Sequence, residues 1–334
     1  MSLSEAEIQV LAQIRGAEAE SEPTDRQTIE ARGERYWNYL EDWNGAFASL
    51  TNGGFIEAVK DGYCLTDKGR PLADDYYKER PDMYWYFFQQ LYGAAYESKT
   101  HKEFCKRMYG RDLCQENMTD MSILDGMLEK LTLQPGDQVL DLGCGSGGIA
   151  SYVSENYGVN ITGIDYSDAA VKVASARTID KRDVLSFQKG DLNTLEVPEN
   201  SYDAAYSVDS IYWVADATDT VKRITRGIKP GGKFAVIIAL IADYCESPEE
   251  LEIDGTFVAD AFKKLQIEYE GYDYTDEFRD WWPRIRENAL ALRPEYEREG
   301  NAFIADVYIK EADTEFLPAI EAGDIRKYLY MATV

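Results

Sequence analysis

The sequence has little positive charge. Lysine and arginine together number 35 against 61 aspartates and glutamates, which gives a formal net charge of −26 over 334 residues. Such an excess of acid repels nucleic-acid phosphates and anionic membrane surfaces, so we expect neither as a partner. We interpret the acids as a solvated surface, and they favour neutral or cationic small molecules as substrates.

Long apolar stretches are also lacking. No run of about 18 uninterrupted apolar residues is available to span a bilayer, and residues 1–7 lack the basic and then apolar order of a signal peptide. These absences predict a cytoplasmic protein. Hydrophobic residues make up 45% of the chain, which is enough for a substantial core and indicates a globular enzyme.

Cysteine and histidine are sparse. The five cysteines are scattered without a C-x-x-C pair, so we expect neither a disulfide framework nor a zinc knuckle, and we predict no metal site. His101 is the only histidine and lies in the polar run 98–103. Its residue type allows a catalytic role, but a lone histidine in such a run is more often a surface or helix-face residue.

The stretch from Val139 to Gly148 is the most informative part of the sequence. It reads VLDLGCGSGG, an apolar run that stops at Asp141 and continues into four glycines. A buried strand that ends in a glycine loop before a helix lets the backbone approach a ligand closely, and the helix N-terminus offers free N–H groups. The spacing of the glycines differs from the dinucleotide fingerprint. The stretch therefore predicts a nucleotide-type pocket.

Strands and helices alternate from Asp137 onward, which is typical of a doubly wound α/β sheet. We expect strands at 138–142, 160–164, 185–188, 202–207 and 233–240. The helices between them are expected near 147–157, 167–178 and 218–227. Right-handed crossovers then place the loops that follow these strands along one edge of the sheet, where a ligand meets all of them.

Acidic residues stand at the ends of these strands. Asp165 ends the second strand, where a carboxylate can accept hydrogen bonds from both ribose hydroxyls, and Tyr166 is placed to lie against an adenine ring. Asp191 and Asp209 follow the third and fourth strands. The alternatives are that Asp165 and Asp191 cap helices, and that the last glycines of the loop serve only close helix packing.

The order and spacing of these features resemble the motifs of class I S-adenosylmethionine (SAM) dependent methyltransferases. The resemblance covers residues 138–240 and includes Gly190-Asp191-Leu192, Ser207 to Ser210 and the turn 229–232. It implies a seven-stranded sheet with an antiparallel edge, and SAM as a cofactor that becomes S-adenosylhomocysteine. In the family, the acid at Asp191 accepts from the adenine amino group, and a neighbouring backbone N–H reaches the ring.

The resemblance also implies which residues contact the cofactor. They come from the motifs above and from the segment ahead of the glycine loop. The expected cofactor-binding residues are Gln115, Asp141, Gly143, Cys144, Gly145, Gly147, Asp165, Tyr166, Asp191, Leu192, Ser207 and Asp209.

Residues 109–131 and 207–213 are similar to the small-molecule branch of the family, which includes phosphoethanolamine, glycine or sarcosine, and sterol or tocopherol methyltransferases. Trp213 stands where the phosphobase enzymes carry a functional histidine, and this departure argues against phosphoethanolamine as the substrate. We expect five residues around the transferred methyl group, with packing as the alternative for the last two aromatics: Tyr109, Gln115, Asp209, Tyr212 and Trp213.

The expected function is methyl transfer to a small molecule. An amine nitrogen is the leading acceptor, because Asp209 can orient an ammonium group and a neutral amine needs little more than positioning. An oxygen or a prenyl-type carbon is the alternative acceptor and calls for a base, for which His101 is the hypothesis. A different class of answer is a SAM-binding regulatory protein without catalysis.

Residues 1–130 are expected to form a mainly helical region. A weak helix near residues 8–14 is placed at the periphery, an amphipathic helix or helix pair at 29–50, and a hairpin at 55–69. This order resembles the winged-helix module that pairs two subunits in many O-methyltransferases, which implies a homodimer. Residues 131–334 are expected to form the SAM-binding domain, with a helical lid at about 273–322.

Overall fold

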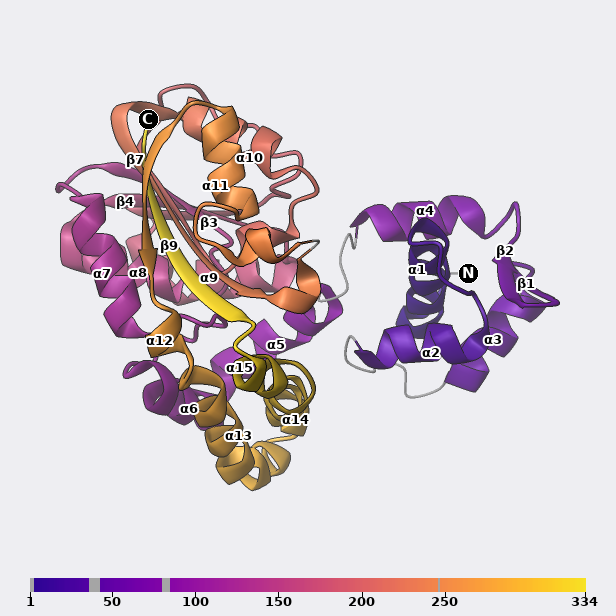
Figure 1. Cartoon of the computed structure of the whole chain (residues 1–334). Helices are drawn as coiled ribbons and strands as arrows, with labels where there is room; N and C mark the ends of the chain where they lie inside the picture. Colours follow the sequence, from indigo (N-terminus) through magenta and orange to yellow (C-terminus); the bar gives the residue numbers. More distant parts are fainter. Residues whose placement is uncertain (1–2, 36–42, 80–84, 246) are drawn as a thin grey trace. The chain divides into compact units, whose positions relative to one another are not determined.

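The computed structural model describes residues 3–35, 43–79, 85–245 and 247–334. The chain forms two compact units, which divide between Gln90 and Leu91 (Figure 1). This division lies well ahead of residue 130, where the sequence predicted it. Helices α6 (Lys99–Tyr109) and α7 (Met121–Leu131) belong to the second unit because α6 packs on helix α13 (Trp281–Arg298) and α7 packs on the sheet.

The first unit is organised around helix α1 (Glu5–Ala19). Leu11 and Ile14 are fully buried in its core, so the expectation of a peripheral helix is wrong. The helix starts with a capping box, in which the Ser4 hydroxyl accepts from the Glu7 N–H and the Glu7 carboxylate accepts from the Ser4 N–H. Polar Gln9 and Gln13 are buried on the same helix, which is why its apolar pattern is weak in the sequence.

Two further predictions for the first unit are confirmed. The segment 29–50 forms a helix pair, α2 (Arg26–Arg35) and α3 (Trp43–Asn52), although residues 36–42 lie outside the described part of the chain. The hairpin consists of β1 (Ile56–Val59) and β2 (Gly62–Leu65), and helix α4 (Arg70–Glu79) follows it. Pairing of two subunits through this unit stays a prediction.

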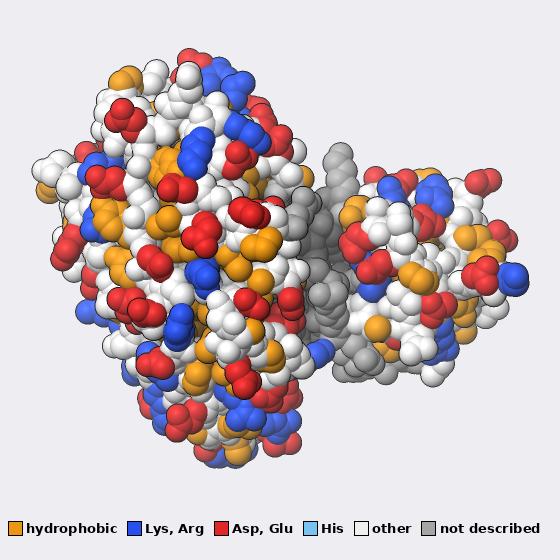
Figure 2. Space-filling view, in the orientation of Figure 1, with side chains coloured by type: hydrophobic (Ala, Val, Ile, Leu, Met, Phe, Trp, Pro, Cys, Tyr) orange, Lys and Arg blue, Asp and Glu red, His pale blue; other side chains and the backbone are white. Residues whose placement is uncertain are grey.

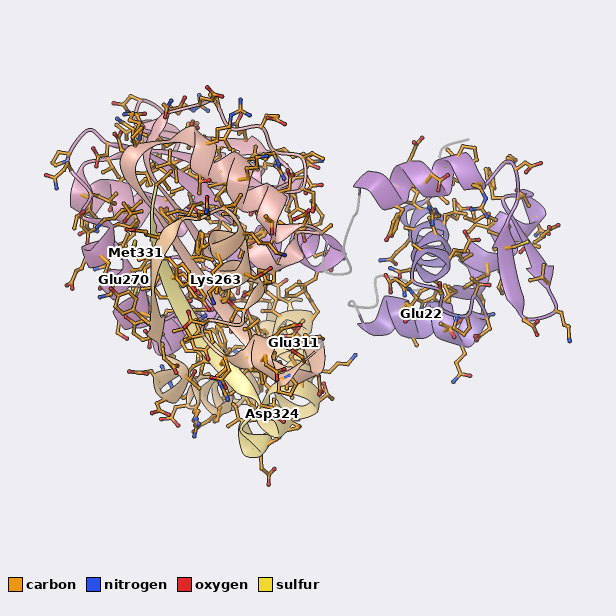
Figure 3. The ribbon with its side chains drawn as sticks, turned by 45° about the horizontal axis from the view of Figure 1, so that its top comes forward. Glu22, Lys263, Glu270, Glu311, Asp324 and Met331 are labelled. Atoms are coloured by element: carbon orange, nitrogen blue, oxygen red, sulfur yellow. The ribbon has the colours of Figure 1, made fainter. Side chains whose placement is uncertain are left out.

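The second unit is built on a seven-stranded sheet with the order β5-β4-β3-β6-β7-β9-β8. The five strands from β3 to β7 are parallel, and β9 and β8 add the predicted antiparallel edge. Glu270 on β8 is the register partner of Met331 on β9 (Figure 3). The strands are β3 (Gln138–Leu142), β4 (Asn160–Asp165), β5 (Leu185–Lys189), β6 (Tyr202–Val208), β7 (Ile228–Ile241), β8 (Glu268–Asp273) and β9 (Ile325–Thr333).

The first four strands match their predicted ranges to within one residue, whereas β7 begins five residues earlier than expected. The predicted turn 229–232 lies inside this early part of β7, where it forms a bulge. Tyr202 pairs with Ile228 and Ala204 already pairs with Lys233, so four residues of β7 stand opposite one residue of β6.

Helices cover both faces of the sheet. Alternate residues of a strand point to opposite faces, so Val139 packs with the helices of one face and Leu140 with those of the other. The first face is covered by α7 and α8 (Gly148–Tyr157), and the second by α10 (Ala217–Gly227) and α11 (Phe257–Lys264). Helix α9 (Asp168–Arg177) connects β4 to β5.

A helical insertion separates β8 from β9, as the sequence predicted. It consists of α12 (Thr275–Phe278), α13, α14 (Ala302–Glu311), a π-helical turn (Ala312–Phe316) and α15 (Leu317–Ala322). The insertion lies beside α6 (Figure 1), where Glu299 accepts hydrogen bonds from the hydroxyls of Ser98 (2.5 Å) and Thr100 (2.8 Å). Its function as a lid stays a prediction.

One face of the molecule carries its charge in a mixed pattern. On the face shown in Figure 2, aspartates and glutamates are scattered among lysines and arginines and do not gather into one acidic patch. This distribution agrees with a solvated surface. No helix of the described residues has both the length and the apolar character needed to cross a membrane.

Candidate functional site

The glycine loop leaves the buried end of β3 and turns into α8. Its backbone has positive φ angles at Gly143 (78°), Gly145 (50°) and Gly147 (71°), a conformation that favours glycine. Strand β4 holds the loop, because the N–H groups of Gly143 and Cys144 both donate to the Ile164 carbonyl at 2.8 and 3.0 Å. The loop is therefore fixed at the carboxyl end of the parallel strands.

A second segment, 112–117, lies directly over the start of α8. The Leu113 carbonyl oxygen is 1.7 Å from the place that a Cβ on Gly148 would occupy, so only glycine fits there. The Ser146 hydroxyl donates to the Cys114 carbonyl (2.6 Å), and Arg177 donates to the Leu113 carbonyl (3.0 Å). These bonds position Gln115 beside the loop, and its predicted contact with the cofactor stays a prediction.

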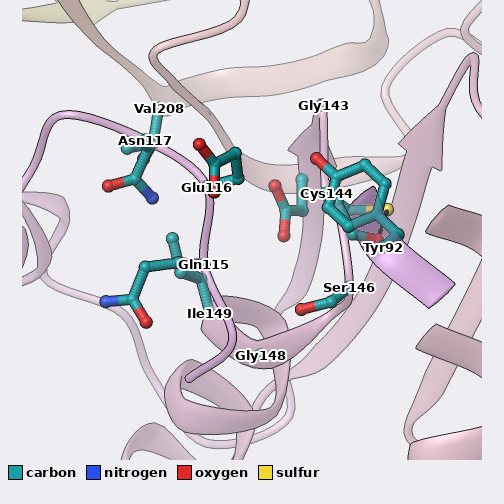
Figure 4. A pocket seen from close by; sticks show the side chains of 12 residues that line it. Tyr92, Gln115, Glu116, Asn117, Gly143, Cys144, Ser146, Gly148, Ile149 and Val208 are labelled. Carbon is teal, nitrogen blue, oxygen red and sulfur yellow. Dashed lines mark hydrogen bonds between the residues drawn. The ribbon is translucent and has the colours of Figure 1, made fainter. Parts of the chain in front are cut away.

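The loop and this segment border a hollow (Figure 4), whose empty volume is about 360 Å³ when the solvent at its open side is included. Gln115, Glu116 and Asn117 line it on one side, and Tyr92 of α5 (Trp85–Glu97) lines it on the other. Among the predicted cofactor-binding residues, those that line the hollow are Gln115, Asp141, Gly143, Cys144 and Gly145. Gly147 instead turns toward Ala174 and Phe187, which lie 2.9 Å from the place of a Cβ, so its role includes helix packing.

Asp141 is a buried acid with an unused hydrogen-bonding atom. Its side chain is only 3% exposed, and among the described residues its Oδ2 has no hydrogen-bond partner. Burial raises the pKa of Asp141 to about 7; the Tyr206 hydroxyl lies near enough to oppose this rise but makes no hydrogen bond of normal geometry. An unsatisfied buried carboxylate that faces a hollow fits a cationic or hydrogen-bond-donating ligand.

Asp165 ends β4 and fixes the neighbouring loops. Its Oδ2 accepts from the Gly145 N–H (2.8 Å) and its Oδ1 from the Ser167 N–H (2.9 Å). Burial raises the pKa of Asp165 to about 6, and these backbone bonds oppose the rise. Each oxygen keeps a second acceptor site, so binding of ribose hydroxyls stays a prediction. Ser167, and not Asp165, is the cap of α9.

Asp191 and its neighbours lie at the same edge of the sheet as Asp165. The Gly190 N–H donates to the Asp165 carbonyl (3.0 Å), which brings the end of β5 beside the end of β4. Asp191 accepts from the Asn193 N–H (2.9 Å), and the Leu192 carbonyl accepts from Arg223 (3.0 Å). Tyr166 is half-buried at this edge. The adenine contacts predicted for these residues remain predictions.

Asp209 is already saturated by groups of the chain itself. Its carboxylate pairs with Lys327 of β9, whose Nζ lies 2.6 and 2.8 Å from the two oxygens, and both side chains are fully buried. It also accepts from the Met118 N–H (2.9 Å) and from the hydroxyls of Thr119 (2.7 Å) and Tyr212 (3.1 Å). The ammonium that we expected from a substrate is thus supplied by Lys327, which the sequence analysis missed.

Two further residues predicted for the site, Tyr109 and Ser207, have structural partners. The hydroxyl of buried Tyr109 donates to the Asn117 carbonyl (2.7 Å), so it holds the segment that lines the hollow. Ser207 is fully buried and bonds to the Ser210 hydroxyl (2.8 Å). The side chain of Trp213 lies outside the described part of the structure.

His101 is buried inside the second unit and does not line the hollow. Its Nδ1 lies 3.1 Å from the Tyr296 hydroxyl and its Nε2 lies 3.4 Å from the Cys105 sulfur. Burial lowers its pKa to about 4, so the ring is neutral near pH 7. The expectation of a surface histidine is wrong, and the base hypothesis gains no geometric support.

Glu116 is a second acid of the hollow that the sequence analysis missed. It lines the hollow from the segment 112–117, and its Oε2 accepts a hydrogen bond from the hydroxyl of Tyr308 on α14. Burial raises its pKa to about 8. No local pattern marks this residue, because its partner lies in the helical insertion 192 residues away.

Comparison with known proteins finds a family match for part of the chain. Residues 140–236 match the family described as a methyltransferase domain. A phosphoethanolamine N-methyltransferase of Triticum aestivum is 32% identical over 231 residues, covering 62% of this chain and 43% of the relative. A sterol 24-C-methyltransferase of Gibberella zeae is 28% identical over 217 residues, covering 62% of this chain and 53% of the relative. The chain thus spans about half the length of these two curated relatives.

Solved structures show the same fold. The cyclopropane synthase MmaA2 of Mycobacterium tuberculosis superposes with a TM-score of 0.56 at 15% identity, covering 73% of this chain and 98% of that one. A phosphoethanolamine N-methyltransferase of Haemonchus contortus, in complex with phosphomonomethylethanolamine and S-adenosylhomocysteine, superposes with a TM-score of 0.53 at 20% identity, covering 74% and 60%.

Proposed function

Because the chain contains a class I SAM-dependent methyltransferase domain of the small-molecule type, we propose that the whole protein methylates the nitrogen of a small amine. The observation that carries the proposal is the hollow at the glycine loop, which two acids line and no lysine or arginine lines among the residues that the structure describes. Such a pocket favours cationic ligands over anionic ones, because a cation stabilises the ionised form of each acid whereas an anion opposes it.

The residues present fit the cofactor. The unsatisfied Oδ2 of Asp141 suits the ammonium of the methionine portion, and Asp165 keeps acceptor sites for the ribose hydroxyls. Tyr166, Asp191 and Leu192 lie at the sheet edge beyond the ribose, where adenine is expected. When bound, SAM supplies a methyl group on a positively charged sulfur.

The chain's own contribution to the reaction is positioning and exclusion of water. The segment 112–117 lies over the loop and is bonded to it through the Cys114 carbonyl. The Tyr109 hydroxyl holds the end of the segment by donating to the Asn117 carbonyl, and Asp209 holds the next residue by accepting from the Met118 N–H. An uncharged amine then needs only to be held in line with the methyl group. The names of the wheat and nematode relatives, both N-methyltransferases, support nitrogen as the acceptor atom.

Release of S-adenosylhomocysteine during incubation with SAM and a panel of acceptors tests the proposal. The panel contains phosphoethanolamine, glycine, sarcosine, simple phenols, sterols and prenyl diphosphates. We expect turnover with at least one amine and none with the phenols, sterols or diphosphates. Turnover confined to phenols or sterols would move the acceptor atom to oxygen or carbon. Tight SAM binding without any turnover would favour a regulatory SAM-binding protein.

A further inference from the structure

Glu116 has one oxygen held by the protein and one available to a ligand. Oε2 accepts from the Tyr308 hydroxyl, and among the described residues no donor reaches Oε1. The residue is part-buried, and its side chain lines the hollow (Figure 4). A carboxylate oriented by one hydrogen bond and open at its other oxygen is built to receive a partner.

A ligand that stabilises the ionised form of Glu116 must bring positive charge, because no lysine or arginine lines the hollow among the described residues. Asp141 and Glu116 are its two ionisable acids, and neither makes an ion pair within the described structure. Arg177 is the nearby cation, and its guanidinium donates to the Leu113 carbonyl and the Ser146 hydroxyl instead. An ionised carboxylate in such a place is costly unless a cation neutralises it.

We propose that Glu116, held by Tyr308, forms a subsite for a small cationic group at the methyl-transfer end of the hollow. The group is either the sulfonium of the cofactor or the acceptor amine in its ammonium form, before it loses the proton that methyl transfer requires, since both present the same chemistry to a carboxylate. This inference rests on the proposed function. It adds Glu116 to the site and requires that the group bound there be positively charged.

The position of Glu116 in the hollow supports a subsite near the methyl group rather than near the adenine. The hollow is lined by Gly143, Asp141 and Val208, whereas Asp165 and Asp191, which are expected at the ribose and adenine, do not line it. Glu116 therefore faces the methionine and methyl side. Its partner Tyr308 comes from the helical insertion, so the insertion contributes to the site through this contact.

The tyrosines and cysteines around Glu116 stay protonated near pH 7. Tyrosines and cysteines face it from four helices and from its own segment, and burial raises the pKa of each: Tyr92, Tyr109, Tyr296, Tyr308, Cys105 and Cys114. Asp141 lines the same hollow, with a pKa raised to about 7. With a pKa of about 8, Glu116 is mostly protonated at neutral pH, so binding of a cation there must release a proton.

The first arm of the test compares SAM with S-adenosylhomocysteine, which lacks the sulfonium charge but keeps the ammonium that Asp141 is expected to bind. Calorimetric titration in two buffers of different ionisation enthalpy counts the protons released. We expect SAM to release more protons than S-adenosylhomocysteine at about pH 7.5, and its relative affinity to rise about tenfold between about pH 6.5 and pH 9, the equivalent of one pKa unit of coupling. Glu116→Gln should abolish both differences.

The second arm examines the acceptor as the source of charge. Protein saturated with S-adenosylhomocysteine is titrated with tetramethylammonium chloride and with uncharged tert-butanol. Preferential binding of the ammonium to the wild type but not to Glu116→Gln would assign the subsite to the acceptor. If neither cofactor preference nor ammonium binding depends on Glu116, the proposal is overturned.

Tyr308→Phe is the second variant. Removing its hydroxyl removes a hydrogen bond that lowers the pKa of Glu116, so the midpoint of the pH dependence should move upward while the preference for the cation persists. An unchanged midpoint would contradict the proposal even if Glu116→Gln fails to fold. The cofactor arm needs no acceptor, so failure of the amine panel leaves its result intact.

Discussion

Two buried acids at the ends of neighbouring strands have opposite surroundings. Asp141 of β3 faces the hollow with Oδ2 unsatisfied, whereas Asp209, directly after β6, has both oxygens engaged by Lys327 and by donors from residues 118–119 and Tyr212. The two strands are adjacent and parallel. The difference teaches that an acid at a strand end can accept from a ligand only as far as the rest of the chain leaves acceptor sites on its oxygens.

The largest effect is expected from removing the ion pair between Lys327 and Asp209. Lys327→Met leaves the Asp209 carboxylate buried without a counter-charge, so we expect a loss of about 3–5 kcal/mol in the free energy of unfolding. Urea denaturation measures it. The double variant Lys327→Met/Asp209→Asn removes both charges and should recover a large part of the loss. Equal losses in the single and double variants would show that the charge pairing is not responsible.

Asp141 should respond to pH in a way that reveals its lack of a partner. Its pKa of about 7 in the folded protein lies above the ordinary value of 3.8, so the stability contributed by its protonated form is present at low pH and lost as the pH rises from about 4 to 7. Asp141→Asn cannot ionise. Its stability relative to the wild type should therefore increase by on the order of 2 kcal/mol between about pH 5 and pH 8.

The measurement is urea unfolding without ligand at both pH values. Asp168→Asn is the matched control, since Asp168 is an exposed acid near the same sheet edge. A pH-independent difference between Asp141→Asn and the wild type would contradict the burial that the structure shows.

Asp165 is a third buried acid at a strand end, and its contribution can be measured through the affinity for the cofactor product. Its replacement by alanine removes the acceptor for the Gly145 N–H and the predicted ribose contact, so affinity for S-adenosylhomocysteine should fall by ~1–3 kcal/mol. Calorimetric titration measures the change, with Asp168→Ala as the control. Unchanged affinity would mean that the end of β4 does not bind the cofactor.

The sheet was predictable because its information is local. Each of the strands β3 to β6 is a short segment with its apolar residues in a run or in alternation, and the glycine loop is recognised by the spacing of its glycines. Helix α1 was misjudged as peripheral because buried Gln9 and Gln13 interrupt its apolar stripe. The unit boundary at Gln90 was missed because no change in composition marks it.

The site was predictable only in part, because half of it depends on contacts between distant residues. The loop, Asp141 and Gln115 were found from motifs, and the hollow brings them together. Lys327 and Glu116 were not found, since their partners lie 118 and 192 residues away along the chain. For the same reason, the sequence could not reveal that Asp209 is neutralised from within.

The position of β9 has a consequence for how the protein is made. This strand inserts between β7 and β8 and carries Lys327, yet ribosomes deliver it after every other strand of the sheet. Until residues 325–333 emerge, β7 has no partner on one side and the Asp209 carboxylate has no counter-charge. The nascent chain therefore completes its sheet and neutralises this site in one late step, when translation of the strand is finished.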